Sequence, residues 1–213
     1  ITWVEGHLRK SANISTRDNI VEIYEKAKEL MDDVGEFLSA NELKVLNETI
    51  ESKALPTPKL LIKDHKKPNG EGCYPTRLVV PATNFTSGFP RLGYLGIKRI
   101  FDNNNIINNH KTIIQASDLK LELEKLNLKK EECTVMSIDI EAMYPSIKFG
   151  MVKKAVQHFS KSLGKDEKET IGKCLNMIKF GMANTLLTFQ DKFYEYGGDC
   201  DPMRRGLTIG GYE

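Results

Sequence analysis

The feature that most constrains this chain is a short apolar run over residues 134–140 that carries a carboxylate at its end. The sequence there reads SIDIEAMYPSI (137–147), in which Asp139 closes the run and Tyr144 follows five residues later. A carboxylate at the end of a buried strand is costly unless it pairs with a cation or binds a metal. Pro145 fixes the backbone beside the Tyr144 ring and removes an amide donor. The pattern therefore predicts a central strand that delivers an acidic group to a site.

Around this strand, segments with helical periodicity alternate with short strand-like segments. We expect a helix over residues 16–33, with Ser15 as its N-cap and Gly35 at its end. We expect a second helix from Ser39 to about Ser52, begun by a capping box with Glu42. Further helices are predicted over residues 90–102, 117–126, 149–162 and 166–182, and strands over 59–63, 76–81, 134–140, 185–190 and 192–196. This alternation predicts an α+β fold, with helices packed on short antiparallel sheets.

Pro56 and Pro58 follow the second expected helix and predict a hinge between helical and sheet-forming parts. We expect three segments: a helical extension over 1–53, a middle segment over 54–116, and a last segment over 117–213.

The charge is unevenly distributed along the chain. The net charge is only +2, but residues 54–113 carry nine lysines and arginines against three acidic residues. A concentrated basic segment suits a polyanion such as nucleic acid. The alternative is a solvated charged face, and charge alone does not separate the two.

The four cysteines form no CxxC pair, which argues against a zinc site and predicts reduced thiols in an intracellular protein. No apolar run is long enough to cross a bilayer, so we expect no membrane partner. The chain begins at Ile1 without an initiator methionine, and we expect it to be a piece of a longer protein.

Several side chains are suited to binding an anionic, metal-dependent substrate. The Asp139 carboxylate and the Ile140 carbonyl are ligands of the kind that Mg²⁺ prefers, although a local cap or ion pair is an alternative for Asp139. Lys63 and Arg77 lie on the two strands of an expected hairpin, where they are placed to clamp a triphosphate, or else to form an exposed charged surface. Lys66 and Lys67 fit the exposed surface better, or contact a nucleic-acid backbone.

Five blocks of the chain, from about residue 54 to the end, resemble the reverse transcriptases, and most of all the Penelope-like retroelement class. The segment IKDHK (62–66) resembles that class's PKIHK, and PTRLVV (75–80) resembles its LRPIVS strand. Residues 137–147 resemble motif A of the polymerase palm. FQDKFY (189–194) resembles the FNGKFY hairpin, and RGLTIGG (205–211) resembles the start of motif B.

The resemblance implies a right-hand polymerase, with 54–116 as fingers and 117–213 as a partial palm. It implies that Asp139 and Ile140 bind catalytic Mg²⁺, with Mn²⁺ as the alternative ion. It implies that Tyr144 excludes a ribose 2′-hydroxyl and that Gly210 lies near the templating base. The implied partners are an RNA or DNA template with its primer and a dNTP, and the implied location is the nucleus. We assign nucleic-acid contacts to five further basic side chains, which are Lys66, Lys67, Arg91, Lys98 and Arg99.

The sequence departs from the family at Ile62 and Leu78, where the family has prolines, and it ends before the paired aspartates of motif C. Two-metal chemistry needs several carboxylates, so we expect this chain alone not to polymerise. Motif A also resembles that of family B DNA polymerases, but the hairpin and the glycine-rich tail do not.

A rival interpretation is a non-catalytic nucleic-acid-binding or assembly module on a polymerase-like fold, using the basic segment. A third is a self-associating fragment that exposes sheet edges.

Overall fold

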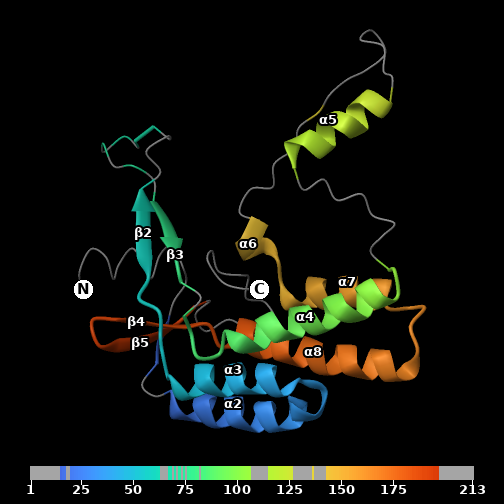
Figure 1. The fold of residues 1–213 in the computed structure, drawn as a ribbon. Helices are drawn as coiled ribbons and strands as arrows, with labels where there is room; N and C mark the ends of the chain where they lie inside the picture. Colours follow the sequence, from blue (N-terminus) through green and yellow to red (C-terminus); the bar gives the residue numbers. More distant parts are fainter. Residues whose placement is uncertain are drawn as a thin grey trace.

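The computed structural model contains two small antiparallel sheets and a larger helical part, which agrees with the predicted α+β class. One sheet has the order β1–β5–β4 and the other is the hairpin β2–β3 (Figure 1). The structure describes residues 15–17, 20–62, 67–68, 70, 72, 74, 76–81, 83–106, 115–126, 136 and 143–196. The predicted central strand over 134–140 and the glycine-rich tail lie outside these residues, apart from Met136.

The first two helices are α2 (Val21–Val34) and α3 (Ala40–Glu51), joined by a short 3₁₀ turn, η1 (Gly35–Phe37). The predicted capping box is confirmed, because Glu42 N donates to Ser39 Oγ at 3.3 Å and Ser39 N donates to Glu42 Oε2 at 2.9 Å. The predicted end of α2 at Gly35 is also confirmed.

The predicted start of the first helix, with Ser15 as its cap, is wrong. Residues Ser15–Arg17 form strand β1, which pairs antiparallel with β5 (Lys192–Glu195), so that Thr16 lies opposite Tyr194. Local helical periodicity is a weak preference, and a free strand edge that satisfies the backbone of these three residues overrides it.

The predicted hinge at Pro56 is also wrong. Pro56 is buried, and its carbonyl accepts a hydrogen bond of 2.9 Å from Thr188 N in β4 (Leu186–Phe189). Two residues earlier, the Ala54 carbonyl accepts one from Phe85 N, also at 2.9 Å. Because backbone bonds to two distant segments hold this stretch, α2 and α3 are fixed to the rest of the protein rather than linked flexibly to it. The boundaries predicted for the three segments remain a prediction.

The two predicted hairpins are present. Strand β2 (Lys59–Ile62) pairs antiparallel with β3 (Thr76–Val79), and β4 pairs antiparallel with β5. Between β4 and β5, Gln190 and Asp191 have φ angles of 50° and 57°. Two consecutive left-handed residues are characteristic of the tight two-residue turn that matches the twist of a hairpin.

The centre of the molecule is the pair α4 (Gly88–Asn103) and α8 (Lys165–Ala183), which lie side by side (Figure 1). Both helices contribute to two hydrophobic clusters. One lies against α2, α3 and β4 and includes Phe89 and Met177, and the other lies against α7 (Phe149–Phe159) and includes Phe101 and Leu175. The α4–α8 pair therefore joins the two halves of the core.

Small residues allow α4 and α8 to approach closely. A Cβ at Gly93 would lie 2.6 Å from the Cys174 carbonyl oxygen, and a Cβ at Gly96 would lie 2.6 Å from Cys174 Sγ. A Cβ at Gly181 would lie 2.5 Å from the ring of Pro90. Cys174 itself is fully buried and burial raises the pKa of its thiol to about 11, so it is a packing residue.

Helix α5 (Ala116–Lys125) stands apart from this helical body in Figure 1. It begins one residue earlier than predicted, where Gln115 N donates to Asp118 Oδ2 at 3.2 Å. Across the described ranges, no helix is both long and apolar enough to span a membrane.

We predict that Gly93→Ala lowers the free energy of unfolding by about 2 kcal/mol, because the added methyl group meets a backbone carbonyl that cannot move aside. Gly172→Ala is the matched control on α8, since a Cβ there has no neighbour within 4 Å. It should raise stability by about 0.5–1 kcal/mol, because alanine loses less backbone entropy than glycine in a helix. Urea unfolding of both variants measures the difference, and equal effects would contradict the close packing.

Candidate functional site

The residues predicted to bind metal and nucleotide fall largely outside the described residues. Asp139, Ile140, Lys63, Lys66 and Gly210 all lie there. The backbone of Arg77 lies in β3, and the backbone of Tyr144 lies in the short helix α6 (Met143–Ser146).

The hairpin β2–β3 brings two of the sequence blocks together. Leu61 lies opposite Arg77 and Ile62 lies opposite Thr76, so the register ends one residue before Lys63. Positions opposite each other in an antiparallel pair share a face of the sheet, as do positions two apart along a strand. Positions 61 and 77 therefore share a face of this sheet, and Lys63 lies outside the described residues.

The cations predicted to contact nucleic acid have different surroundings. Lys67 is exposed. On α4, Lys98 forms an ion pair with Asp102 one turn away, and this hydrogen bond raises the pKa of Lys98. Arg99 pairs with Glu42 of α3, and Arg91 lines a groove between α3 and α4. Two of the three basic residues of α4 thus face carboxylates, and the phosphate contacts remain a prediction.

Within the described part of the chain, no group of three or more histidine, cysteine, aspartate or glutamate side chains is arranged to hold a metal. The predicted ligands Asp139 and Ile140 lie outside that part, so Mg²⁺ binding stays a prediction.

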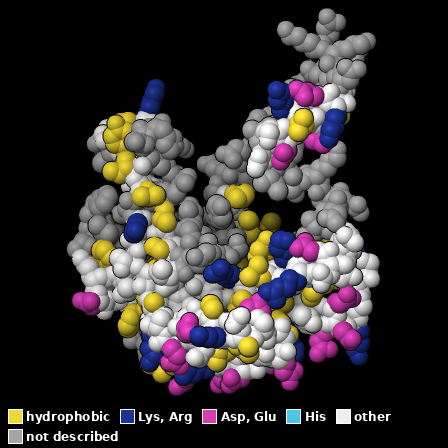
Figure 2. Space-filling view, viewed as in Figure 1, with side chains coloured by type: hydrophobic (Ala, Val, Ile, Leu, Met, Phe, Trp, Pro, Cys, Tyr) yellow, Lys and Arg dark blue, Asp and Glu magenta, His cyan; other side chains and the backbone are white. Residues whose placement is uncertain are grey.

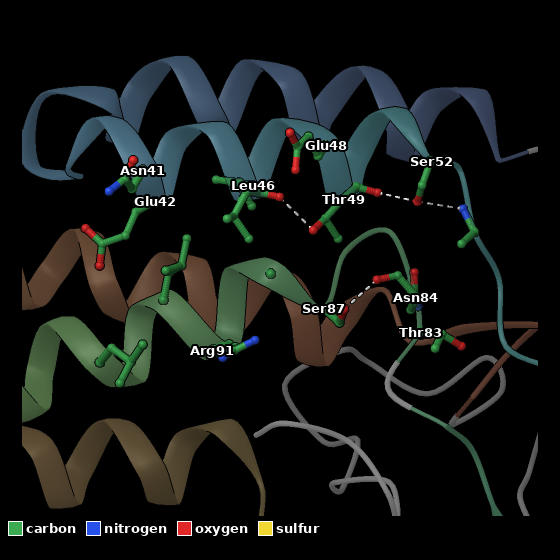
Figure 3. A pocket seen from close by; sticks show the side chains of 15 residues that line it. Asn41, Glu42, Leu46, Glu48, Thr49, Ser52, Thr83, Asn84, Ser87 and Arg91 are labelled. Atoms are coloured by element: carbon green, nitrogen blue, oxygen red, sulfur yellow. Dashed lines mark hydrogen bonds between the residues drawn. The ribbon is translucent and has the colours of Figure 1, made fainter.

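The structure also contains a groove that the sequence did not predict. It lies between α3 and α4, near the loop that contains Thr83 and Asn84, and has a volume of about 620 Å³ (Figure 3). Leu46, Leu92 and Leu95 form part of its walls, together with the half-exposed Val45. A Cβ at Gly88 would lie 2.8 Å from Leu46 Cδ1, so this glycine brings the end of α4 close to α3.

Most hydroxyl and amide groups of the groove are hydrogen bonded to the protein itself. Thr49 Oγ1 donates to the Val45 carbonyl at 2.8 Å, and Ser52 Oγ donates to the Thr49 carbonyl at 2.6 Å. At the other end, Ser87 Oγ donates to the Asn84 carbonyl at 2.6 Å (Figure 3). Because these groups already have partners, the walls present mainly carbon atoms to a ligand.

Asn84 anchors that end of the groove to the centre of the molecule. Its buried side-chain nitrogen donates to the carbonyls of Asn184, at 3.2 Å, and Leu186, at 3.3 Å. Its Oδ1 accepts from Thr86 N at 3.1 Å, and Thr86 Oγ1 donates to the Asn184 carbonyl at 3.1 Å. The loop before α4 is therefore fixed to the junction of α8 and β4.

The ion pair between Glu42 and Arg99 joins the two walls of the groove. The Glu42 side chain is 14% exposed and accepts from Arg99, from Ser39 Oγ and from Ser39 N. The hydrogen bond from Arg99 lowers the pKa of Glu42 to about 2, since the folded state favours the ionised carboxylate.

No protein-family model matches this chain, and neither the curated proteins nor the solved structures contain a match to it.

Two features of the site were missed by sequence reasoning. Glu42 was identified as a capping residue, but its partner Arg99 lies 57 positions away and was assigned to nucleic acid. The groove exists because α3 and α4 cross at a particular place. The spacing of apolar residues in the sequence predicts each helix, but it does not predict how the two helices cross.

We predict that Glu42→Gln lowers the free energy of unfolding by about 1 kcal/mol at neutral pH, because it removes the charge from a hydrogen bond with Arg99. The pKa of Glu42 in the folded state, about 2, lies below its ordinary value of 4.5. The contribution of the carboxylate is thus complete above about pH 4.5 and is lost as the pH falls toward 2.

Urea unfolding between pH 2 and pH 7 should therefore show a difference between the wild type and Glu42→Gln that shrinks toward acid. Glu48→Gln is the matched control, because it removes an exposed carboxylate from the same helix and should leave the profile unchanged. A constant difference at every pH would contradict this role of the ion pair.

Proposed function

We propose that this chain is the fingers and partial palm of an RNA-directed DNA polymerase of the reverse-transcriptase class. The observation that carries the proposal is the β2–β3 hairpin. It pairs β2, which ends at Ile62, the first residue of the block 62–66, with β3, which lies within the block 75–80 and contains Arg77. In the proposal, Lys63 follows β2 directly and acts with Arg77, because two cations suit the recognition of a triphosphate.

The hairpin β4–β5 supports the same proposal. It coincides with the block FQDKFY, which resembles the family's FNGKFY. Asparagine and glycine are the preferred residues of a two-residue hairpin turn because both accept a positive φ. Gln190 and Asp191 adopt that backbone conformation in this chain without the preferred residues. This chain therefore has the kind of turn that asparagine and glycine would favour at these two positions.

In the proposed reaction, the 3′-hydroxyl of a primer attacks the α-phosphate of a dNTP, and pyrophosphate leaves. Bound Mg²⁺ would supply charge stabilisation for the phosphates. The Asp139 carboxylate and the Ile140 carbonyl are the proposed ligands, and Lys63 and Arg77 would hold the triphosphate. Tyr144 would exclude ribonucleotides, and Gly210 would lie near the templating base. The proposal includes a nuclear location and a template–primer as partner.

The test uses the full gene product that contains residues 1–213, with an RNA template, a DNA primer, dNTPs and Mg²⁺. Asp139→Asn should reduce primer extension by about a hundredfold or more, because it removes a negative ligand from the reacting centre. Asp33→Asn is the matched control on an exposed position of α2 and should leave extension unchanged. No extension by the wild type, or equal extension by Asp139→Asn, would exclude the polymerase function.

A second variant tests the role of Tyr144. The variant Tyr144→Ala replaces the ring by a methyl group. It should lower the preference for dNTPs over ribonucleotides by about tenfold or more, because the ring no longer excludes the ribose 2′-hydroxyl. Tyr94→Ala, at an exposed position of α4, is the control and should keep the preference. An unchanged preference in Tyr144→Ala would remove this residue from the nucleotide site.

The non-catalytic interpretation has its own outcome in the same experiments. It predicts that the full gene product binds nucleic acid but does not extend a primer, and that binding survives Asp139→Asn. The slope of log K against log salt counts the phosphates that are contacted.

A further inference from the structure

Helix α7 and its flanking turns carry positive charge without any acidic residue. Residues 142–165 contain five lysines and no aspartate or glutamate, and they lie outside the basic segment 54–113. On α7, Lys153 and Lys154 are exposed, and Lys161 is exposed in the turn that follows. Like charges gathered on one surface repel one another, and a bound polyanion relieves that repulsion.

The exposed lysines of α7 share one side of the helix with two polar residues. With about 3.6 residues per turn, positions 153, 154, 157 and 158 fall within an arc of about 140°. Gln157 and His158 are exposed like the two lysines. We call Lys153, Lys154, Gln157 and His158 the basic face of α7. The other side of the helix packs into the hydrophobic cluster that includes Leu175, through Phe149, Val152 and Val156.

The two lysines of the basic face have no carboxylate partner in the part of the chain that the structure describes. Other helices differ in this respect. Lys26 pairs with Glu22 on α2, and Lys120 pairs with Glu124 on α5. Figure 2 shows the outcome, since cationic and anionic side chains lie side by side on α5 and over α2 and α3. The charge of the basic face is therefore available to a partner.

The basic face suits the sugar–phosphate backbone of a nucleic acid. Lysine supplies a point charge, while Gln157 and His158 supply hydrogen-bond donors of the kind that contact phosphate oxygens. From position 153 to position 161 the surface extends for about 12 Å. The phosphates of one strand recur about every 3.4 Å along a duplex, so about three of them fit alongside.

An anionic membrane is the other large surface of negative charge, and α7 suits it less. A helix that binds a membrane surface inserts its apolar side between the lipids. The apolar side of α7 is already packed in the core, where Phe149 is 4% exposed. This packing favours nucleic acid as the partner.

We propose that the basic face of α7 contacts the phosphate backbone of the template–primer. In this arrangement the β2–β3 hairpin holds the triphosphate, and α7 holds the nucleic acid. The inference rests on the proposed function for the identity of its partner, but it does not require the polymerase reaction.

The test measures how residues 1–213 bind a fluorescently labelled RNA–DNA heteroduplex at several salt concentrations, with circular dichroism as a check on folding. The double variant Lys153→Ala/Lys154→Ala should bind about tenfold more weakly at low salt. The slope of log K against log salt should fall by about two, because two phosphate contacts are lost. Lys153→Arg/Lys154→Arg should bind as the wild type does, since both charges remain.

The matched control is Lys26→Ala/Lys44→Ala, which removes the same charge from two exposed lysines that pair with carboxylates on α2 and α3. It should leave the affinity and the slope unchanged. Equal weakening by both double variants would mean that only the net charge matters, and it would overturn the proposal. A wild-type chain that does not bind the heteroduplex would overturn it as well.

Two further measurements separate this surface from the reaction and from a membrane. Asp139→Asn should leave heteroduplex binding unchanged, so a gene product that extends no primer but whose binding needs Lys153 and Lys154 refutes the reaction and supports the surface. Vesicles of phosphatidylserine and phosphatidylcholine provide the alternative partner. If Lys153→Ala/Lys154→Ala loses binding to the vesicles and keeps binding to the heteroduplex, the surface binds membranes and the proposal is wrong.

Discussion

The close contact between α4 and α8 is the interaction on which the rest of the structure depends. Gly93 brings the backbone of α4 against the Cys174 carbonyl of α8, while Gly96 and Gly181 leave room for the Cys174 thiol and the Pro90 ring. Because of this contact, α4 and α8 both contribute side chains to the two hydrophobic clusters. It also fixes the end of α8, where the Asn184 carbonyl accepts hydrogen bonds from Asn84 and Thr86. The loop before α4, the start of β4 and one end of the groove are thereby positioned together.

Helix α4 also binds α3, through the ion pair between Arg99 and Glu42. Arg99 binds a carboxylate that also caps α3, so the same Glu42 begins a helix and joins it to another. Part of the basic charge that suggested a nucleic-acid surface is committed to the fold, which leaves the hairpin region as the stronger candidate for binding phosphates. The apolar groove between these helices is a surface separate from the hairpin region.

Most helices and both hairpins could be predicted because their signals are local. Ser39 and Glu42 are three residues apart, and β4 and β5 flank a polar turn of two residues. The errors arose where distant residues decide the structure. Ser15 joins a sheet through a strand about 180 positions away, and Pro56 is held by a backbone bond from Thr188. The partner of Arg99 and the existence of the groove depend in the same way on how helices cross. For the candidate metal site, the sequence supplied the residues and the resemblance supplied their roles.

The central proposal is that Asp139, four residues before α6 in the sequence, binds a divalent metal ion beside the nucleotide that the β2–β3 hairpin would hold. Paramagnetic broadening by Mn²⁺ tests it directly, since the effect falls steeply with distance from the ion. In an amide NMR spectrum with a dNTP present, Mn²⁺ should broaden the signals of Met143, Tyr144 and Ser146 in α6 and of Thr76–Val79, and spare those of α2. Broadening confined to the acidic surfaces of α2 and α3, with α6 and the hairpin unaffected, would contradict the account.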